Sequence, residues 1–197
     1  MITAGSAAAL ISSAGVPAAP ATPGKFIYCL NTSTISGKNQ GIEFYLETAA
    51  RAGYDAVELW LMDIQYYLEH GGTVEKLSRK IKDTGLTFAS AIGFAPWMVA
   101  DDALRSKGFK QMEEEMNLVA ALGCTRIAAP AAGVTPEEPI DLFAIGKRYA
   151  ELLSLGKKTG VRPLLEFWGA SRFFHIGQTV NAALVAGSAD AKILPDV

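Results

Sequence analysis

The chain lacks several features that would narrow its function at once. No run of about 18 apolar residues occurs, so no segment is expected to span a membrane. The 18 lysines and arginines stand against 20 aspartates and glutamates, and the net charge of −2 gives no basic excess for a nucleic-acid partner. No CxxC motif predicts structural zinc. These absences disfavour a membrane span, a nucleic-acid partner and a structural zinc site.

The chain contains only two cysteines, Cys29 and Cys124. They lie far apart in apolar surroundings, which favours two buried free thiols over a disulfide.

Residues 1–24 differ in composition from the rest of the chain. They are rich in Ala, Ser, Gly and Pro and contain no charged residue. The apolar stretch Ala7–Ile11, followed by small residues, resembles the trailing part of a secretory or twin-arginine signal, although no basic residue precedes it. We keep two interpretations open, a remnant of an export signal and a low-complexity tail. The location is accordingly expected to be cytoplasmic or exported, with residues 25–197 forming the folded domain.

From Lys25 onward one pattern recurs. A helical stretch ends in a glycine, a few residues follow, and a short apolar run comes next. About thirty residues, the length of one βα unit, separate successive glycines. A glycine suits the position after a helix, where a positive φ is needed. The glycines in question are Gly53, Gly85, Gly123, Gly160 and Gly187.

The apolar runs predict six strands, at 26–31, 55–60, 87–92, 125–130, 162–167 and 192–196. They are continuous rather than alternating, as expected of parallel strands covered on both faces. Five helical connections join them, one of which (62–84) is expected to break at Gly71-Gly72. The stretch at 101–122 carries an apolar stripe, and the run Glu113-Glu114-Glu115 is expected on its solvated face.

Strands that alternate with helices indicate an α/β fold of the (β/α)₈ TIM-barrel type. A closed barrel usually needs about 250 residues, so roughly two βα units are missing and the predicted barrel is incomplete. An open doubly wound sheet is the alternative. Against it, CLNTSTISG stands where a glycine-rich phosphate turn should follow the first strand.

Carboxylates stand at the ends of three predicted strands. Glu166 and Asp196 close the fifth and sixth strands, and Glu58 lies near the end of the second. An ionised carboxylate closing an apolar strand is costly to bury unless it is paired or binds a metal. Adjacent strands lie about 4.8 Å apart, so Glu166 and Asp196 can reach one hard cation. The pair predicts part of a divalent-metal site, and a plain surface position is the alternative for each residue alone.

Further polar and aromatic residues follow the strand ends. Asn31 ends the first strand, and Glu58 is expected too far round the barrel to join the metal pair. Glu58 would instead hold a substrate hydroxyl or a buried cationic side chain. Trp60, Trp97 and Trp168 could form an apolar wall for the non-polar face of a sugar or polyol, and packing beneath the loops is the alternative for each. His175 could also reach the mouth of the barrel.

The segments AARAGYDAVELW, ASAIGFAPW, RIAAPAAG, LLEFWG and ILPDV resemble the sugar phosphate isomerase/epimerase family. This is the xylose isomerase-like barrel group, which also contains hydroxypyruvate isomerases, ketose 3-epimerases, inosose dehydratases and endonuclease IV-type repair enzymes. The resemblance runs from about Lys25 to Val197.

The resemblance implies a divalent metal (Mn²⁺, Mg²⁺, Co²⁺ or Zn²⁺) held by four side chains, of which Glu166 and Asp196 match the first two. It also implies that Glu166 moves a proton on an open-chain sugar through an enediolate while the metal polarises the carbonyl. The histidine and second glutamate of the family pattern have no counterpart before Val197, so we expect weak metal binding and impaired turnover in this chain.

Three hypotheses follow. The first is a sugar isomerase or epimerase represented by a truncated chain. The second is a non-catalytic remnant that pairs the exposed edges of its sheet with another chain, for example as a homo-oligomer. The third is a metal-dependent abasic-site endonuclease of the same superfamily, which the absence of lysine and arginine clusters disfavours.

Overall fold

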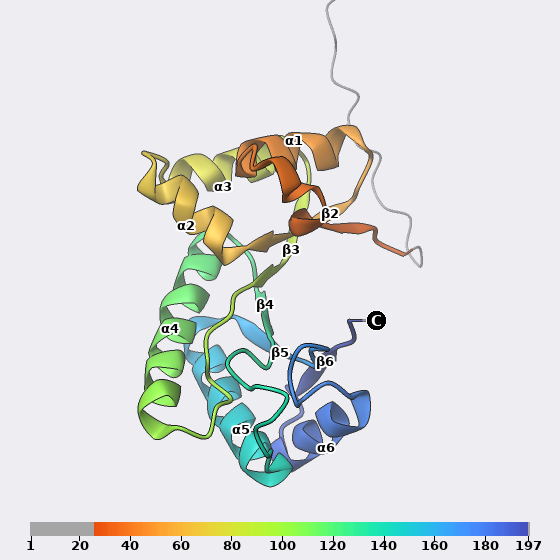
Figure 1. Ribbon diagram of the computed structural model, residues 1–197. Helices are drawn as coiled ribbons and strands as arrows, with labels where there is room; N and C mark the ends of the chain where they lie inside the picture. The colour runs from red at the N-terminus through yellow and green to blue at the C-terminus, as the bar shows by residue number, and fades with distance from the viewer. Residues whose placement is uncertain (1–25, 197) are drawn as a thin grey trace, which may run out of the picture.

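The structure is a computed structural model and describes residues 26–196 (Figure 1). The predictions for residues 1–24 lie outside this range. In chain order the elements are β1 Cys29–Asn31, the 3₁₀ helix η1 Thr32–Lys38, α1 Ile42–Arg51, β2 Ala56–Trp60, α2 Leu61–Glu69, α3 Val74–Asp83, β3 Thr87–Ile92, α4 Asp102–Ala121, β4 Arg126–Ala129, α5 Leu142–Thr159, β5 Arg162–Glu166, α6 Ile176–Ala186 and β6 Lys192–Leu194.

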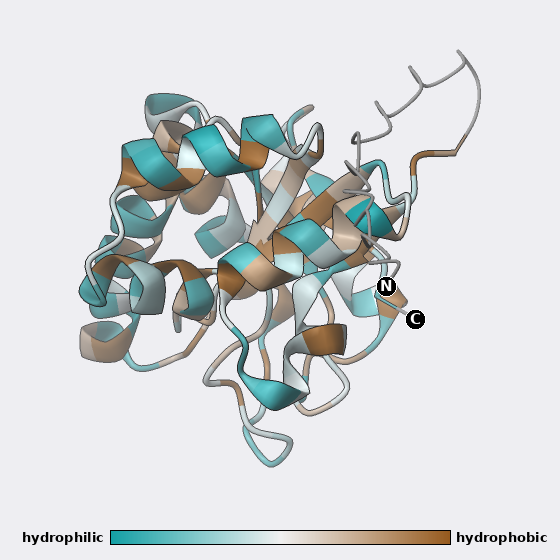
Figure 2. Cartoon of the chain, turned by 90° about the horizontal axis from the view of Figure 1, so that it is seen from above, coloured by the Kyte–Doolittle hydropathy of each residue, from teal (hydrophilic) through white to brown (hydrophobic). Residues whose placement is uncertain are grey.

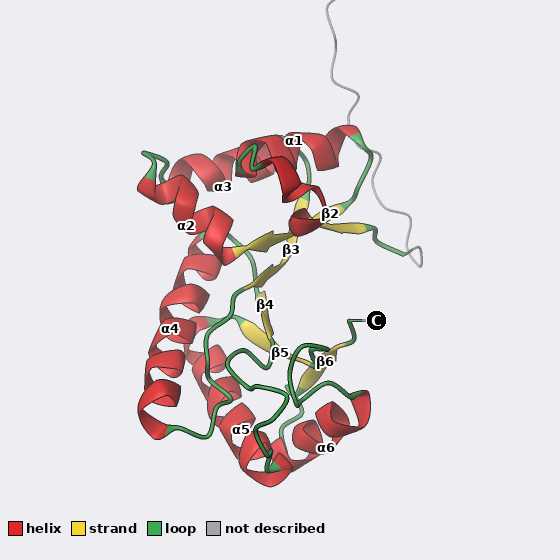
Figure 3. Cartoon of the chain, viewed as in Figure 1, coloured by secondary structure: helices red, strands yellow, loops and turns green. Residues whose placement is uncertain are grey.

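The six strands form one parallel sheet in the order β1-β2-β3-β4-β5-β6. Figure 3 shows the strands as an arc with the helices on its outer side, which is an incomplete barrel of the (β/α)₈ type. Within residues 26–196, β1 pairs only with β2 and β6 only with β5. The predicted strand count, the parallel sheet and the five helical connections are confirmed.

The expected helix ends are also confirmed. The five recurring glycines all have a positive φ, between 62° and 89°. The connection from β2 to β3 is divided as expected, because α2 ends at Glu69 and α3 begins at Val74, on either side of Gly71-Gly72. Within the described residues, no helix is long and apolar enough to cross a membrane.

The core lies between the sheet and the helices. Seen from above, the helices turn their apolar sides, coloured brown, toward the sheet and their polar sides, coloured teal, outward (Figure 2). The stripe of α4 packs as predicted, with Met112, Met116 and Val119 buried. Glu113 and Glu114 are exposed, but Glu115 is 4% exposed, so the prediction that the whole run is solvated was wrong for its last residue.

The two cysteines are both free, but only Cys124 is buried. The prediction of burial was wrong for Cys29. Alternation along β1 places Cys29 on the same side as Asn31, toward the interior of the arc, while Leu30 packs in the core. Because β1 is an edge strand, that interior side is open to solvent at Cys29.

Helices α5 and α6 approach closely at Gly146. A Cβ added there would lie 2.5 Å from Cβ of Val185 and 2.8 Å from the carbonyl oxygen of Ala182. We expect Gly146→Ala to lower the free energy of unfolding by about 1–3 kcal/mol through overpacking, measured by urea denaturation. Gly169→Ala is the control, since nothing lies within 4 Å of its added Cβ. A gain of about 1 kcal/mol in Gly146→Ala, as helix propensity alone gives, would contradict this packing.

Candidate functional site

The carboxyl end of β1 carries a hydrogen-bonding centre built on Asn31. Its Oδ1 accepts three hydrogen bonds, from Trp60 Nε1 at 2.8 Å, from Ser33 Oγ at 2.8 Å and from the Ser33 backbone N–H at 3.0 Å. Its Nδ2 donates to Glu58 Oε2 at 2.7 Å. Asn31 also begins η1, so the local fold and the contacts with β2 depend on the same side chain.

Strand pairing explains why these groups meet. Asn31 pairs with Glu58, and Glu58 pairs with Ser90 of β3, so all three lie in one row across the sheet. Burial raises the pKa of Glu58, while Ser90 and the hydrogen bond from Asn31 partly oppose this and the Asp196 carboxylate adds to it. The hydrogen bond from Asn31 holds one oxygen of Glu58 at the mouth of the barrel.

Glu166 ends β5 as predicted, and it is 5% exposed. Its Oε2 is buried with no hydrogen-bond partner. Burial, followed by the charges of Glu58 and Asp196, raises the pKa of Glu166 to about 8. A buried carboxyl without a donor, beside two other carboxyls, is poorly stabilised as an anion and is suited to receive a cation or a proton.

Asp196 lies two residues beyond β6, which is shorter than predicted and ends at Leu194. The aspartate is exposed, yet its charge acts on both Glu166 and Glu58. Within residues 26–196 no three such carboxyls are arranged to hold one metal, and the expectation that Glu58 stands apart from the metal pair stays a prediction. The charges of Glu58 and Asp196 nevertheless act on Glu166.

An aromatic row crosses the same end of the sheet. The ring of Trp60 lies 5.1 Å from that of Phe94, tilted by 53°, and Phe94 lies 6.0 Å from Trp168, tilted by 46°. Phe94 is 38% exposed and Trp168 is 39% exposed. Trp97 is placed differently from the prediction, because it is fully buried, packs near Tyr149 and donates its indole N–H to the Pro130 carbonyl.

Phe94 was missed in the sequence, and the residue before it, Gly93, leaves room for a carboxyl of α4. A Cβ at Gly93 would stand 2.5 Å from Oε2 of Glu115, so the carboxyl of α4 packs directly against the end of β3. Gln111 Nε2 donates to the other oxygen of Glu115 at 2.7 Å, and burial raises the pKa of this glutamate. The signal in the sequence was the glycine just after the strand, which permits the close approach of Glu115.

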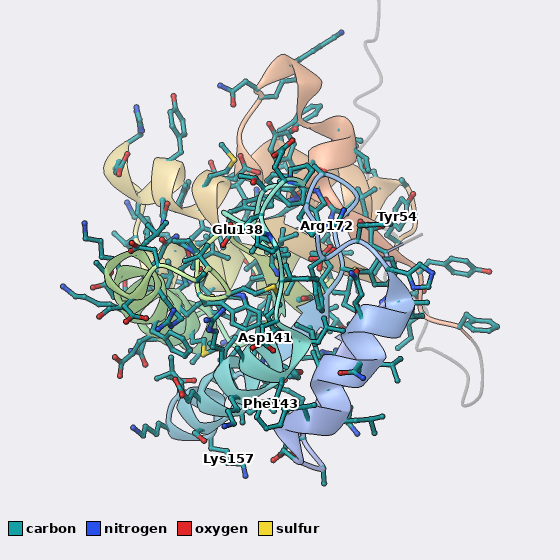
Figure 4. The ribbon with its side chains drawn as sticks, turned by 60° about the horizontal axis from the view of Figure 1, so that its bottom comes forward. Tyr54, Glu138, Asp141, Phe143, Lys157 and Arg172 are labelled. Carbon is teal, nitrogen blue, oxygen red and sulfur yellow. The ribbon has the colours of Figure 1, made fainter. Side chains whose placement is uncertain are left out.

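Two other features stand apart from these strand ends. His175 is exposed and begins α6, where its Nδ1 accepts from the Gly177 N–H at 3.0 Å. A surface cavity of about 200 Å³ lies at the amino end of β5, near Lys157, which Figure 4 labels on α5. The charges there are already paired, since Asp190 lies 3.4 Å from Lys157 and 3.6 Å from Arg162.

The donor set fits a hard divalent cation in part. The partnerless oxygen of Glu166 and the nearby Asp196 are oxygen donors of the kind such cations prefer. Within residues 26–196, no group of three or more His, Cys, Asp or Glu side chains is arranged to hold a metal. Glu166 and Asp196 are therefore candidates for two ligands of such an ion.

Comparison with known families matches residues 46–194 to the xylose isomerase-like TIM barrel. The chain belongs to the xylose isomerase-like TIM barrel family. A search of curated proteins found no significant match.

Solved structures of this barrel family share the fold at low sequence identity. An IOLI protein with a bound zinc atom has a TM-score of 0.74 and 19% identity. A probable 3-DHS dehydratase, AsbF, from Bacillus anthracis has a TM-score of 0.72 and 17% identity. A D-psicose 3-epimerase in the presence of D-fructose has a TM-score of 0.66 and 16% identity. Each comparison covers 85% of this chain and 62% of the other, so the chain spans less than two thirds of these relatives' length.

Proposed function

We propose that the chain carries part of the active site of a sugar isomerase or epimerase, with Glu166 as the residue that moves the proton. The observation that supports this is the buried, partnerless Glu166 carboxyl at the end of β5, whose pKa of about 8 suits proton transfer near neutral pH. The named epimerases among the structural neighbours are in agreement with it.

In this proposal Glu166 takes a proton from the carbon next to the sugar carbonyl, which leaves an enediolate. Glu166 then returns this proton to the former carbonyl carbon while the hydroxyl proton of the first carbon passes to the carbonyl oxygen, so that substrate and product are isomers of one formula. Glu166 and Asp196 would hold Mn²⁺, Mg²⁺, Co²⁺ or Zn²⁺, which when bound supplies a Lewis acid for the carbonyl oxygen. Asn31, Glu58, Trp60 and Trp168 would contact the sugar. Trp97 is not retained among these contacts, because it lies in the core.

A proton-exchange experiment tests the role of Glu166. The full chain is incubated with Mn²⁺ and D-fructose in deuterated water, and deuterium incorporation at the sugar carbons is followed by NMR. We expect slow incorporation that falls by at least 100-fold in Glu166→Gln, because general acid–base catalysis contributes about 10²–10⁴-fold.

Glu113→Gln is the matched control, since it removes one exposed carboxylate from α4. Its exchange rate should equal that of the wild type. Equal exchange in Glu166→Gln and the wild type would refute the proposed role.

The second hypothesis, a barrel that interacts through its edges without catalysis, predicts no exchange in any variant. The endonuclease alternative is disfavoured by the net charge of −2, which gives no basic excess to bind a phosphate backbone.

A further inference from the structure

Three neighbouring strands each begin with a cationic residue. Arg126 begins β4, Arg162 begins β5 and Lys192 begins β6. Arg126 and Arg162 are partners in the register of β4 and β5, so their side chains leave the same side of the sheet from backbones about 4.8 Å apart. Like charges at such positions repel each other. Because the three residues are far apart in the sequence, this group is not evident without the fold.

A fourth cation stands beside them, and one carboxylate is shared between two of the four. Lys157 of α5 lies 3.4 Å from the Asp190 carboxylate, and Arg162 lies 3.6 Å from it. Within residues 26–196, neither Arg126 nor Lys192 takes part in a salt bridge. All four cationic side chains are exposed. This cationic patch (Arg126, Lys157, Arg162 and Lys192) therefore has an excess of positive charge on a chain whose net charge is −2.

The surface cavity of about 200 Å³ adjoins the cationic patch. Its lining combines Lys157, Arg162 and Asp190 with the apolar side chains of Leu153 and Pro163. Figure 4 labels Lys157, which lies at the end of α5. The cavity thus offers two cationic groups and an apolar wall to one small ligand.

We propose that the cationic patch and this cavity bind the phosphate group of a small molecule. A phosphate monoester carries a charge of about −1.5 to −2 at pH 7, which would offset the positive charge that Asp190 leaves unbalanced. Guanidinium groups bind phosphate oxygens through two parallel hydrogen bonds. Arg126 is already oriented, since its Nε donates to the Ala89 carbonyl at 2.8 Å and its two Nη groups remain as donors.

The size of the cationic patch favours a small ligand over a polymer. Three neighbouring strands span about 10 Å, which is room for one phosphate group and its substituent. A nucleic acid needs a longer basic surface, and the net charge of −2 opposes it.

The phosphate site goes beyond the proposed function and stands apart from it. Arg162 and Glu166 occupy opposite ends of β5, about 13 Å apart at 3.3 Å per residue. A phosphate group held at the amino end of β5 is therefore remote from the carboxyl that is proposed to move a proton. Binding is measured without metal or sugar, so either proposal can fail while the other stands.

Titration of the ¹⁵N-labelled full chain in EDTA tests the site by NMR. Inorganic phosphate and phenyl phosphate are the two probes, and sodium chloride at equal ionic strength is the reference. We expect saturable movement of the Lys157 and Arg162 amide signals with phosphate and not with chloride. Tighter binding of phenyl phosphate would identify the ligand as an ester that uses the apolar wall, and tighter binding of inorganic phosphate would identify free phosphate. Equal movement in chloride would overturn the proposal.

Two neighbouring lysines of α5 give a matched pair of variants. Lys157 lines the cavity, whereas Lys158 is exposed in the same turn and does not. We expect Lys157→Gln to weaken phosphate binding severalfold and Lys158→Gln to leave it unchanged. Arg162→Gln should weaken it at least tenfold, because the fork of charged donors is lost. Equal losses in Lys157→Gln and Lys158→Gln would show a general charge effect and refute a built site.

Asp190→Asn is expected to act in the opposite direction. It removes the carboxylate that competes with phosphate for Lys157 and Arg162, so the affinity for phosphate should rise severalfold. This variant and Lys157→Gln decide the matter even if Arg162→Gln does not fold. An affinity that stays the same or falls in Asp190→Asn would overturn the proposal.

Discussion

Replacing Glu166 by glutamine is expected to stabilise the protein at alkaline pH and to leave it nearly unchanged in acid. The pKa of Glu166 is raised to about 8 by burial and then by the charges of Glu58 and Asp196, whereas in the unfolded chain it lies near its ordinary value of 4.5. The folded wild type therefore holds its proton more tightly than the unfolded chain and loses stability as the pH rises from about 4.5 through about 8.

The expected difference between wild type and Glu166→Gln reaches about 2–4 kcal/mol at pH 9, since each pKa unit is worth about 1.4 kcal/mol and water that reaches the carboxyl reduces the total. Urea denaturation in EDTA at half-unit steps from pH 4 to pH 9 measures it. The free energy of unfolding of Glu113→Gln should change with pH in the same way as that of the wild type across the range. A pH-independent difference would show that Glu166 ionises normally in the folded protein.

Tyr149→Phe is expected to destabilise β6 and the whole domain. The Tyr149 hydroxyl is fully buried and joins two strands, lying 3.0 Å from the Pro163 carbonyl, 2.8 Å from the Lys192 carbonyl and 3.1 Å from the Lys192 N–H. Phenylalanine would leave these backbone groups without a partner at about 1–3 kcal/mol for an unsatisfied group. We expect the free energy of unfolding to fall by about 2–3 kcal/mol.

Hydrogen exchange locates the effect. Relative to the wild type, Tyr149→Phe should speed amide exchange far more in β6 than in β3, because β6 is an edge strand of three residues. Tyr28→Phe removes the hydroxyl of a tyrosine that is 62% exposed and should change neither stability nor exchange. Uniformly faster exchange across all six strands would mean that Tyr149 acts on the core as a whole rather than on β6.

The sequence was sufficient for the parts of the fold that depend on local chemistry. The five glycines after the helices mark real helix ends, because a positive φ suits glycine whatever surrounds it. The apolar runs predicted all six strands, since parallel strands are buried on both faces. Glu58 and Glu166 lie on β2 and β5 as predicted, and their roles in a site stay predictions.

The remaining features depend on contacts between distant segments. Trp97 and Phe94 are three residues apart in a loop, and only packing against Tyr149 and the Pro130 carbonyl decides which is buried. Glu115 is buried because Gly93 makes room for it. Neither the packing partners of Trp97 nor the glycine that admits Glu115 can be identified from spacing along the chain. The effect of the Glu58 charge on the pKa of Glu166 likewise depends on how the sheet curves, which a strand count does not supply.

The register of β2 against β3 shifts between Val57 and Glu58, where Val57 pairs with Phe88 and Glu58 with Ser90. Ala89 is thus an extra residue, and its carbonyl accepts from Arg126 Nε at 2.8 Å. Counting by twos from Phe88 would direct Phe94 toward the helices, and the extra residue turns it toward Trp60 instead. We expect deletion of Ala89 to restore regular pairing and to keep Phe94 at the mouth, with the loss of the acceptor of Arg126.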